Sequence, residues 1–227
     1  MNAVAIDGPA GAGKSTLSRK LAMHLGYIYV DTGAMYRAVG LKLIRKKCDV
    51  GNEKQVADIL KSTQVEISYE NGNQVVILDG ENVNDLIRTP EVSMMASKCS
   101  ALPVVRAFLL EMQRNLAKEN SVVMDGRDIA TVVLPFAQVK IFLTASVDAR
   151  AKRRYDELIS KGENVTLEEV TRDVEQRDYN DTHRDIAPLK PSEDSVIVDT
   201  TELNFEESLE ALKETVKRVL EGEANAL

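Results

Sequence analysis

One stretch near the N-terminus has the residue types and spacing of a phosphate-binding loop. It reads GPAGAGKS from Gly8 to Ser15 and fits the pattern G-x-x-x-x-G-K-[ST] in full. Glycines let backbone N–H groups approach phosphate oxygens, and the N-terminus of a following helix adds partial positive charge. The Lys14 side chain suits the outer phosphates, and the Ser15 hydroxyl suits Mg²⁺. The loop predicts binding of a nucleoside triphosphate with Mg²⁺, and it leaves open whether the triphosphate is hydrolysed, transferred or sensed.

Two further polar clusters follow short apolar runs. Arg37 comes soon after the run that ends at Val30, and its guanidinium could hold a second phosphate group. Asp125 ends another run and is placed like the acidic residue that orients Mg²⁺ in phosphate-loop enzymes, with Arg127 and Asp128 close behind. Ligands of open α/β sheets bind beyond the carboxyl ends of the strands, so we expect these side chains in one cleft. A surface arginine at position 37 and a turn-forming aspartate at position 125 are the simpler alternatives.

A long polar segment lies between Arg150 and Lys190. It contains nine Lys or Arg residues and ten Asp or Glu residues, so it is not a basic patch. A solvated helical hairpin of mixed charge is one interpretation. A mobile lid that closes over phosphates is the other, because phosphoryl transfer must exclude water as a competing acceptor. Composition alone does not decide between them.

The spacing of apolar residues predicts the elements that carry these groups. Ala3 to Asp7 is a short apolar run, and leucines at positions 17, 21 and 25 then mark one face of a helix. Another short run, 27–30, and a helical stretch, 35–47, extend this β-α-β-α order, which indicates a parallel sheet. The same alternation resumes later, with a helix over 105–116, strands over 121–124, 139–143 and 195–198, and an amphipathic helix over 205–219.

A different pattern interrupts the α/β order between residues 48 and 89. A short helix is expected over 52–62, and apolar residues then alternate from Val65 to Tyr69. The turn sequence Asn71-Gly72-Asn73 and the apolar run 75–78 follow, which predicts a β-hairpin. We therefore expect three parts: a core of 1–47, 90–149 and 189–227, an insert of 48–89 and a lid of 150–188.

Composition excludes several classes of protein. The 227 residues are 44% hydrophobic and 29% charged, which is ordinary for a globular protein and excludes collagenous and wholly disordered chains. The net charge of -7 argues against a partner such as duplex DNA or RNA, whereas a local cationic pocket could still bind a small anion. The two histidines and two cysteines are scattered, which argues against a structural zinc site.

The sequence also predicts a location. Cys48 and Cys99 have no CxxC partner, which is typical of a reducing compartment. No stretch reaches 18 apolar residues, and Met1 to Gly8 lacks the basic region and apolar run of a signal peptide. We expect a cytoplasmic protein with no membrane partner.

Taken together, the motifs resemble those of bacterial cytidylate kinases. In order they read GPAGAGKST, DTGAMYR, IRTPEVS, GRDIATVV and RDYNDTHRDIAPL, and the resemblance extends over essentially the whole chain. It implies the fold of nucleoside monophosphate kinases: a P-loop core with a five-stranded parallel sheet flanked by helices, a small antiparallel insert and a helical lid. It also implies ATP as phosphoryl donor, Mg²⁺ as cofactor, and conversion of CMP or dCMP to the diphosphate by a monomer.

The resemblance implies roles for individual residues. Cytosine presents an amino donor beside ring acceptors, so a carboxylate and a cationic donor together can distinguish it from uracil. The implied ligands of the base are Ser97, Arg106 and Asp128, those of the monophosphate are Arg37, Arg127 and Arg184, and those of the sugar are Arg177 and Asp181. Thr32 stands where some family members have Ser and keeps the hydroxyl.

The remaining implied roles concern the triphosphate and the transferring group. The implied ATP ligands are Gly8, Pro9, Ala10, Gly11, Ala12, Gly13, Lys14, Ser15 and Thr16. The metal would be held by Ser15 and, through water, by Asp125. The charge of the transferring group would be neutralised by Lys14, Arg127, Arg153 and Arg184.

One position departs from the family pattern, and two other functions stay open. Ala130 stands where some relatives have Gly, which matters only if that position needs a positive φ. A P-loop kinase for another small acceptor would keep the phosphate loop and change the base pocket. A nucleotide-dependent switch would hydrolyse ATP slowly without any acceptor. The sequence does not distinguish CMP from dCMP as the preferred acceptor.

Overall fold

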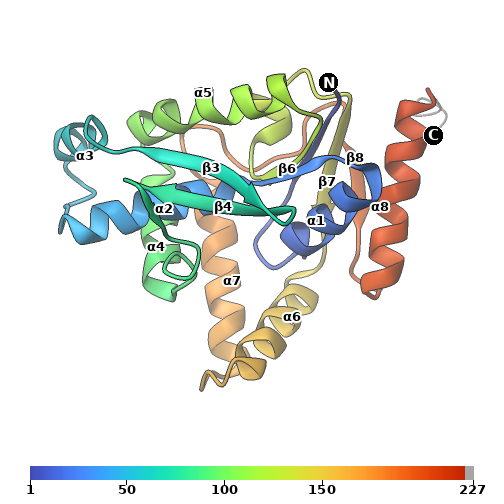
Figure 1. Cartoon of the computed structure of the whole chain (residues 1–227). Helices are drawn as coiled ribbons and strands as arrows, with labels where there is room; N and C mark the ends of the chain where they lie inside the picture. The colour runs from blue at the N-terminus through green and yellow to red at the C-terminus, as the bar shows by residue number, and fades with distance from the viewer. Residues whose placement is uncertain (223–227) are drawn as a thin grey trace.

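Two sheets of different kinds organise the structure, a computed structural model that describes residues 1–222 (Figure 1). The larger sheet is parallel, with the strand order β2-β6-β1-β7-β8. Its strands are β1 (Ala3–Asp7), β2 (Ile28–Asp31), β6 (Val122–Gly126), β7 (Val139–Thr144) and β8 (Val196–Asp199). The smaller sheet is antiparallel and consists of β3 (Val65–Glu70), β4 (Asn73–Leu78) and β5 (Glu81–Asn82). The predicted fold class, including the five-stranded parallel sheet, is confirmed.

Helices flank the parallel sheet. In Figure 1, α6 and α7 lie side by side below the sheet. The helices are α1 (Lys14–Leu25), α2 (Thr32–Arg45), α3 (Glu53–Leu60), α4 (Pro90–Cys99), α5 (Pro103–Glu119), α6 (Val147–Ser160), α7 (Leu167–Thr182) and α8 (Phe205–Leu220). A π-helical turn, η1 (Ile129–Val133), follows β6. Within residues 1–222 no single helix is long and apolar enough to cross a membrane; α4 and α5 meet that test only as a pair bent by 99°.

The central strand β1 is buried along its whole length because helices cover both faces of the sheet. Val4 and Ile6 pack in one apolar cluster with α1 and α8. Ala3 and Ala5 point the other way and pack in a second cluster with η1 and α5. The alternation fixes the register of β1, so Asp7 ends the strand beside Gly126 of β6.

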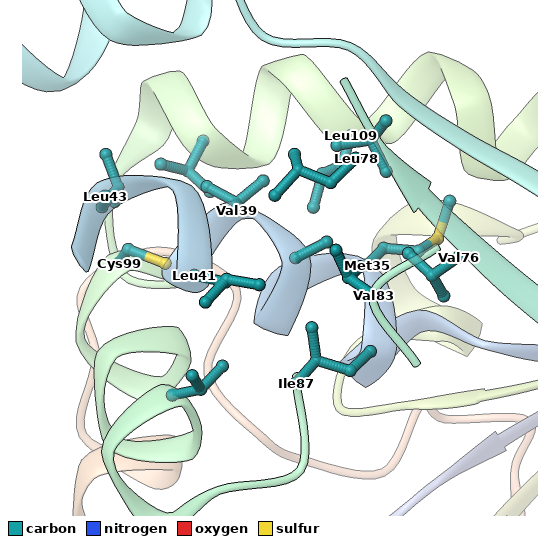
Figure 2. Packing of buried hydrophobic residues seen from close by; sticks show 14 of the residues in the cluster. Met35, Val39, Leu41, Leu43, Val76, Leu78, Val83, Ile87, Cys99 and Leu109 are labelled. Atoms are coloured by element: carbon teal, nitrogen blue, oxygen red, sulfur yellow. The ribbon is translucent and has the colours of Figure 1, made fainter. Parts of the chain in front are cut away.

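The small sheet is joined to the core by an apolar cluster on α2 (Figure 2). Met35 and Val39 of α2 pack with Leu78 of β4 and Leu109 of α5, and Ile87 closes the cluster. Four of these five side chains, all except Val39, are among the largest that are fully buried. The hairpin is therefore held on the same helix that begins directly after β2.

The predicted elements recur with small shifts, and three were missed, the short strand β5 among them. Helix α2 starts at Thr32, three residues earlier than expected, because the Asp31 side chain caps it by accepting from the Ala34 N–H. Helix α4 and the turn η1 were not predicted. The division into core, insert and lid stays a prediction, and residues 223–227 of the predicted core lie outside the described range.

Candidate active site

The predicted phosphate loop connects β1 to α1 and depends on its glycines. A Cβ on Gly8 would lie 2.0 Å from the Leu143 carbonyl oxygen, so the loop packs directly against β7. Gly13 has φ 81° and is the N-cap residue of α1. No side chain of the described residues caps the first turn of this helix. The Lys14 side chain is buried and its Nζ donates to the Pro9 carbonyl at 2.7 Å. The free N-terminus of α1 and a buried ammonium group are both suited to phosphate.

Asp125 is the second-to-last residue of β6, the strand next to β1, and hydroxyl groups surround its side chain. Its carboxylate accepts from Ser15 Oγ at 2.9 Å and from the Tyr29 hydroxyl at 3.1 Å. Thr32 Oγ1 donates to the Asp125 backbone carbonyl at 2.7 Å. Burial raises the pKa of Asp125 to about 6, and burial together with Arg127 lowers the pKa of Lys14 to about 7.

The contact of Ser15 with Asp125 gives a donor set that suits Mg²⁺. A hydroxyl and a carboxylate are hard oxygen ligands, and Mg²⁺ in such sites takes its other ligands from phosphates and water. Among residues 1–222 no group of three or more His, Cys, Asp or Glu side chains could hold a metal ion on its own. The residues fit a metal that arrives with the triphosphate.

Arg127 connects the end of β6 to the predicted lid. Its Nε donates to Asp181 Oδ2 at 2.6 Å, and Asp181 is buried near the end of α7. Burial would raise the pKa of Asp181, but the Arg127 guanidinium outweighs it and holds the pKa below its usual value. This ion pair joins two predicted substrate ligands, Arg127 of the predicted core and Asp181 of the predicted lid.

The residues predicted to read the base form a second buried group. Arg106 of α5 makes an ion pair with Asp128, and Arg184 Nη2 lies 3.6 Å from the other oxygen of the same carboxylate. Arg106 Nη1 also donates to the Ser100 carbonyl at 3.1 Å, and Ser100 Oγ donates to the Ser97 carbonyl at 2.8 Å. Ser97 is thus linked to the group through Ser100 rather than by direct contact.

Two of the arginines predicted to hold the monophosphate have donors without hydrogen-bond partners among the described residues. Arg37 Nη2 pairs with Asp31 at 3.0 Å, whereas its Nε is buried with no hydrogen-bond partner among the described residues. Arg184 Nη2 likewise makes no hydrogen bond within residues 1–222. Burial and the nearby guanidiniums of Arg154 and Arg127 lower the pKa of Arg177. Buried cationic donors without acceptors are suited to an anionic ligand.

Arg153, in contrast, lies away from the phosphate loop. Its guanidinium donates to the backbone oxygen of Thr200 at 2.5 Å and to the Leu203 carbonyl at 3.4 Å. Its neighbour Arg150, which was not predicted, donates to the Ala10 carbonyl of the loop at 3.0 Å and holds Asp178 of α7 with two further hydrogen bonds. One helical turn before Arg153, Arg150 is the arginine of α6 that contacts the loop.

Asp7 is a second residue that the sequence analysis missed. Its carboxylate is buried and accepts from the Ile129 and Ala130 N–H groups, both at 2.8 Å. Burial raises the pKa of Asp7 to about 6. Ala130 is not among the residues with a positive φ, so alanine is unstrained there. Asp7 thus joins the strand before the phosphate loop to the turn that follows Asp128.

Comparison with known proteins identifies the family. The cytidylate kinase family matches residues 4–218 of the chain. A cytidylate kinase of Caldicellulosiruptor bescii is 50% identical over 220 residues, which cover 97% of both chains. One of Carboxydothermus hydrogenoformans is 49% identical over 215 residues, covering 95% of this chain and 97% of the relative. An uncharacterized protein from Eubacterium ventriosum, 12% identical, has a similar fold with a TM-score of 0.50 over 97% of this chain and 98% of its own. The chain belongs to the cytidylate kinase family.

Proposed function

We propose that the chain transfers the γ-phosphoryl group of ATP to CMP or dCMP, forming ADP and CDP or dCDP. Membership of the cytidylate kinase family supports this reaction. The observation that carries it in the structure is the buried group of Arg106, Asp128 and Arg184. Asp128 of this group follows the carboxyl end of β6, and β6 pairs with β1, the strand that leads into the phosphate loop.

ATP would bind along the loop from Gly8 to Thr16, with its phosphates against the N-terminus of α1. Lys14 would turn from the Pro9 carbonyl to the outer phosphates. Ser15 would hold Mg²⁺ directly and Asp125 would hold it through water. When bound, Mg²⁺ supplies positive charge that offsets the negative charge of the phosphates.

Cytosine would be recognised by the pair of Arg106 and Asp128. The Asp128 carboxylate can accept from the N4 amino group, and the Arg106 guanidinium can donate to the ring acceptors. Uracil has a carbonyl at position 4, which would face the carboxylate without a proton between them. Ser97 would complete the base pocket. It lies one helical turn before Ser100, whose carbonyl accepts from Arg106.

The monophosphate would be held by Arg37, Arg127 and Arg184. Arg37 and Arg184 each have a buried donor without a hydrogen-bond partner among the described residues. Its oxygen is already anionic, so transfer needs no strong general base and depends on alignment and charge neutralisation. Asp181 and Arg177 of α7 would contact the sugar. Arg153 stays a predicted lid cation, and it would have to leave Thr200 and Leu203 to reach the phosphates.

The experiment that tests the proposal is an assay of ADP release with ATP and Mg²⁺ over CMP, dCMP, UMP, AMP and no acceptor. We expect turnover with CMP or dCMP and little with the other acceptors. Equal or better turnover with another acceptor would keep the phosphate loop and discard the cytosine pocket. Slow ATP loss that ignores the acceptor would favour a nucleotide-dependent switch.

We also propose that the enzyme is a cytoplasmic monomer that acts on small molecules and needs no nucleic acid or membrane. The two cysteines support a reducing location, because Cys48 and Cys99 are both unpaired thiols. Sedimentation of the purified chain at assay concentrations would test the monomeric state.

A further inference from the structure

Strand β2 lies at an edge of the parallel sheet, paired only with β6 among the described strands. The Ile28 N–H donates to Ser121 on the β6 side. Backbone groups alternate sides along a strand, so those of Tyr29 and Asp31 face outward. Both residues are buried, and buried backbone groups need hydrogen-bond partners.

Two side chains of the β3–β4 hairpin supply three of these partners. Gln74 Oε1 accepts from the Asp31 N–H at 2.8 Å, and Gln74 Nε2 donates to the Asp31 carbonyl at 3.2 Å. The Tyr69 hydroxyl donates to the Tyr29 carbonyl at 3.1 Å. Tyr69 and Gln74 are directly opposite in the hairpin ladder, so both side chains leave the same face. Together they replace a neighbouring strand along the edge of β2.

The backbone that Gln74 holds belongs to the residue that positions Arg37. Asp31 Oδ1 accepts from the Ala34 N–H at 2.8 Å and caps α2, while Asp31 Oδ2 accepts from Arg37 Nη2 at 3.0 Å. The next residue, Thr32, donates to the Asp125 backbone. A shift of Asp31 would therefore move both the start of α2 and the guanidinium of Arg37.

We propose that Gln74, assisted by Tyr69, is a positioning residue for the acceptor site. It holds the Asp31 backbone so that the Asp31 carboxylate places Arg37 for the phosphate of the acceptor. The inference rests on the proposed function, because it takes Arg37 as a ligand of the acceptor phosphate. It assigns a role to the hairpin: the hairpin sets acceptor affinity without touching the acceptor.

The test compares two glutamines of the segment 48–89 in the full chain. Gln74→Leu removes both hydrogen bonds to Asp31. The matched control is Gln55→Leu, because Gln55 also accepts from a backbone N–H, that of Asp49, within the same segment. We expect Gln74→Leu to raise the KM for CMP on the order of 10-fold, with kcat and the KM for ATP changed less than about 2-fold. Gln55→Leu should leave all three constants unchanged.

A double-mutant cycle separates positioning from general support of the fold. In an Arg37→Ala background, adding Gln74→Leu should change the KM for CMP by less than about 2-fold, because its effect passes through Arg37. If Gln74→Leu has the same effect in both backgrounds, the proposal is overturned. It is also overturned if the KM for ATP rises as much as the KM for CMP.

The same data separate this inference from the proposed function. If Arg37→Ala raises the KM for CMP and Gln74→Leu does not, only the inference is wrong. If Arg37→Ala leaves that KM unchanged, the assigned role of Arg37 fails and the inference fails with it. Should Gln74→Leu not fold, Tyr69→Phe removes a single hydroxyl and should raise the KM for CMP about 3-fold, and no rise would overturn the proposal.

Discussion

At the scale of single residues, the proposed acceptor pocket holds more cationic donors than carboxylate oxygens to receive them. Arg106 and Arg184 both approach the one carboxylate of Asp128. Burial raises the pKa of Asp128, and the two arginines oppose that rise. Some N–H donors of such a group stay available for a ligand. The ion pairs with the carboxylate are compatible with a folded protein before the ligand binds.

The first prediction at this scale concerns Arg106. Arg106→Ala should lower the ratio of kcat/KM for CMP over UMP by about 10- to 100-fold, because a hydrogen bond to a charged group is lost. Steady-state kinetics with both acceptors measures the ratio. Lys118→Ala, an exposed change on the same helix, is the control. An unchanged ratio would show that Arg106 does not read the base.

The second prediction concerns Asp7 and pH. Its pKa is raised by burial from 3.8 to about 6, so between these values the folded state binds a proton that the unfolded state has released. The contribution of Asp7 to stability therefore falls as pH rises through this window. Asp7→Asn removes this dependence on pH. The difference in the free energy of unfolding, variant minus parent, should therefore increase by on the order of 2 kcal/mol between about pH 4 and pH 6.

Urea unfolding of both proteins at several pH values measures this difference. Asp58→Asn, at an exposed ion pair of α3, is the control. A difference between Asp7→Asn and the parent that stays constant across the window would contradict the prediction.

At the scale of elements, the site forms where strands end and helices begin. The phosphate loop follows β1, Asp31 ends β2 with Thr32 directly after it, and Asp125 is the second-to-last residue of β6. These three strands are neighbours in one parallel sheet, so their carboxyl ends meet. Helices α6 and α7 of the predicted lid contact the same end of the sheet through Arg150 and Asp181.

The prediction at this scale concerns Arg150. Its guanidinium connects the Ala10 carbonyl of the loop to Asp178 of α7 and is 4% exposed. Arg150→Ala should raise the KM for ATP on the order of 10-fold and the KM for CMP less, because the loop loses its support. The exposed change Lys152→Ala on the same helix is the control. Equal effects of the two variants would contradict a role of Arg150 at the loop.

At the scale of the whole molecule, the sequence predicted what depends on local spacing. The phosphate loop was visible because its glycines, Lys14 and Ser15 all lie within one stretch, 8–15. The hairpin was visible from the alternation between Val65 and Tyr69, the turn sequence 71–73 and the apolar run 75–78, which match β3 and β4. Asp125 was expected near the phosphate loop because it follows a short apolar run, and its hydrogen bond with Ser15 agrees with that expectation. The pairing of Arg106 with Asp128 came from the family resemblance, because the residues are 22 positions apart.

What the sequence did not predict depends on contacts between distant positions. Asp7 and Ile129 are 122 positions apart, so nothing local distinguished Asp7 from a strand-ending aspartate. Arg150 stands in a run of similar basic residues, and only its burial against Ala10 separates it from Arg153. Helix α4 did carry a local signal, since Thr89 caps it and Pro90 is its first residue.

The measurement that tests the central claim most directly is competition for one donor. The chain is incubated with ATP labelled at the γ-phosphate, Mg²⁺ and equal concentrations of CMP, UMP and AMP, and the labelled products are separated. The account predicts that nearly all label appears in CDP, because only cytosine offers an amino donor to Asp128 beside acceptors for Arg106. Label spread evenly over the three diphosphates, or recovered as inorganic phosphate, would contradict it.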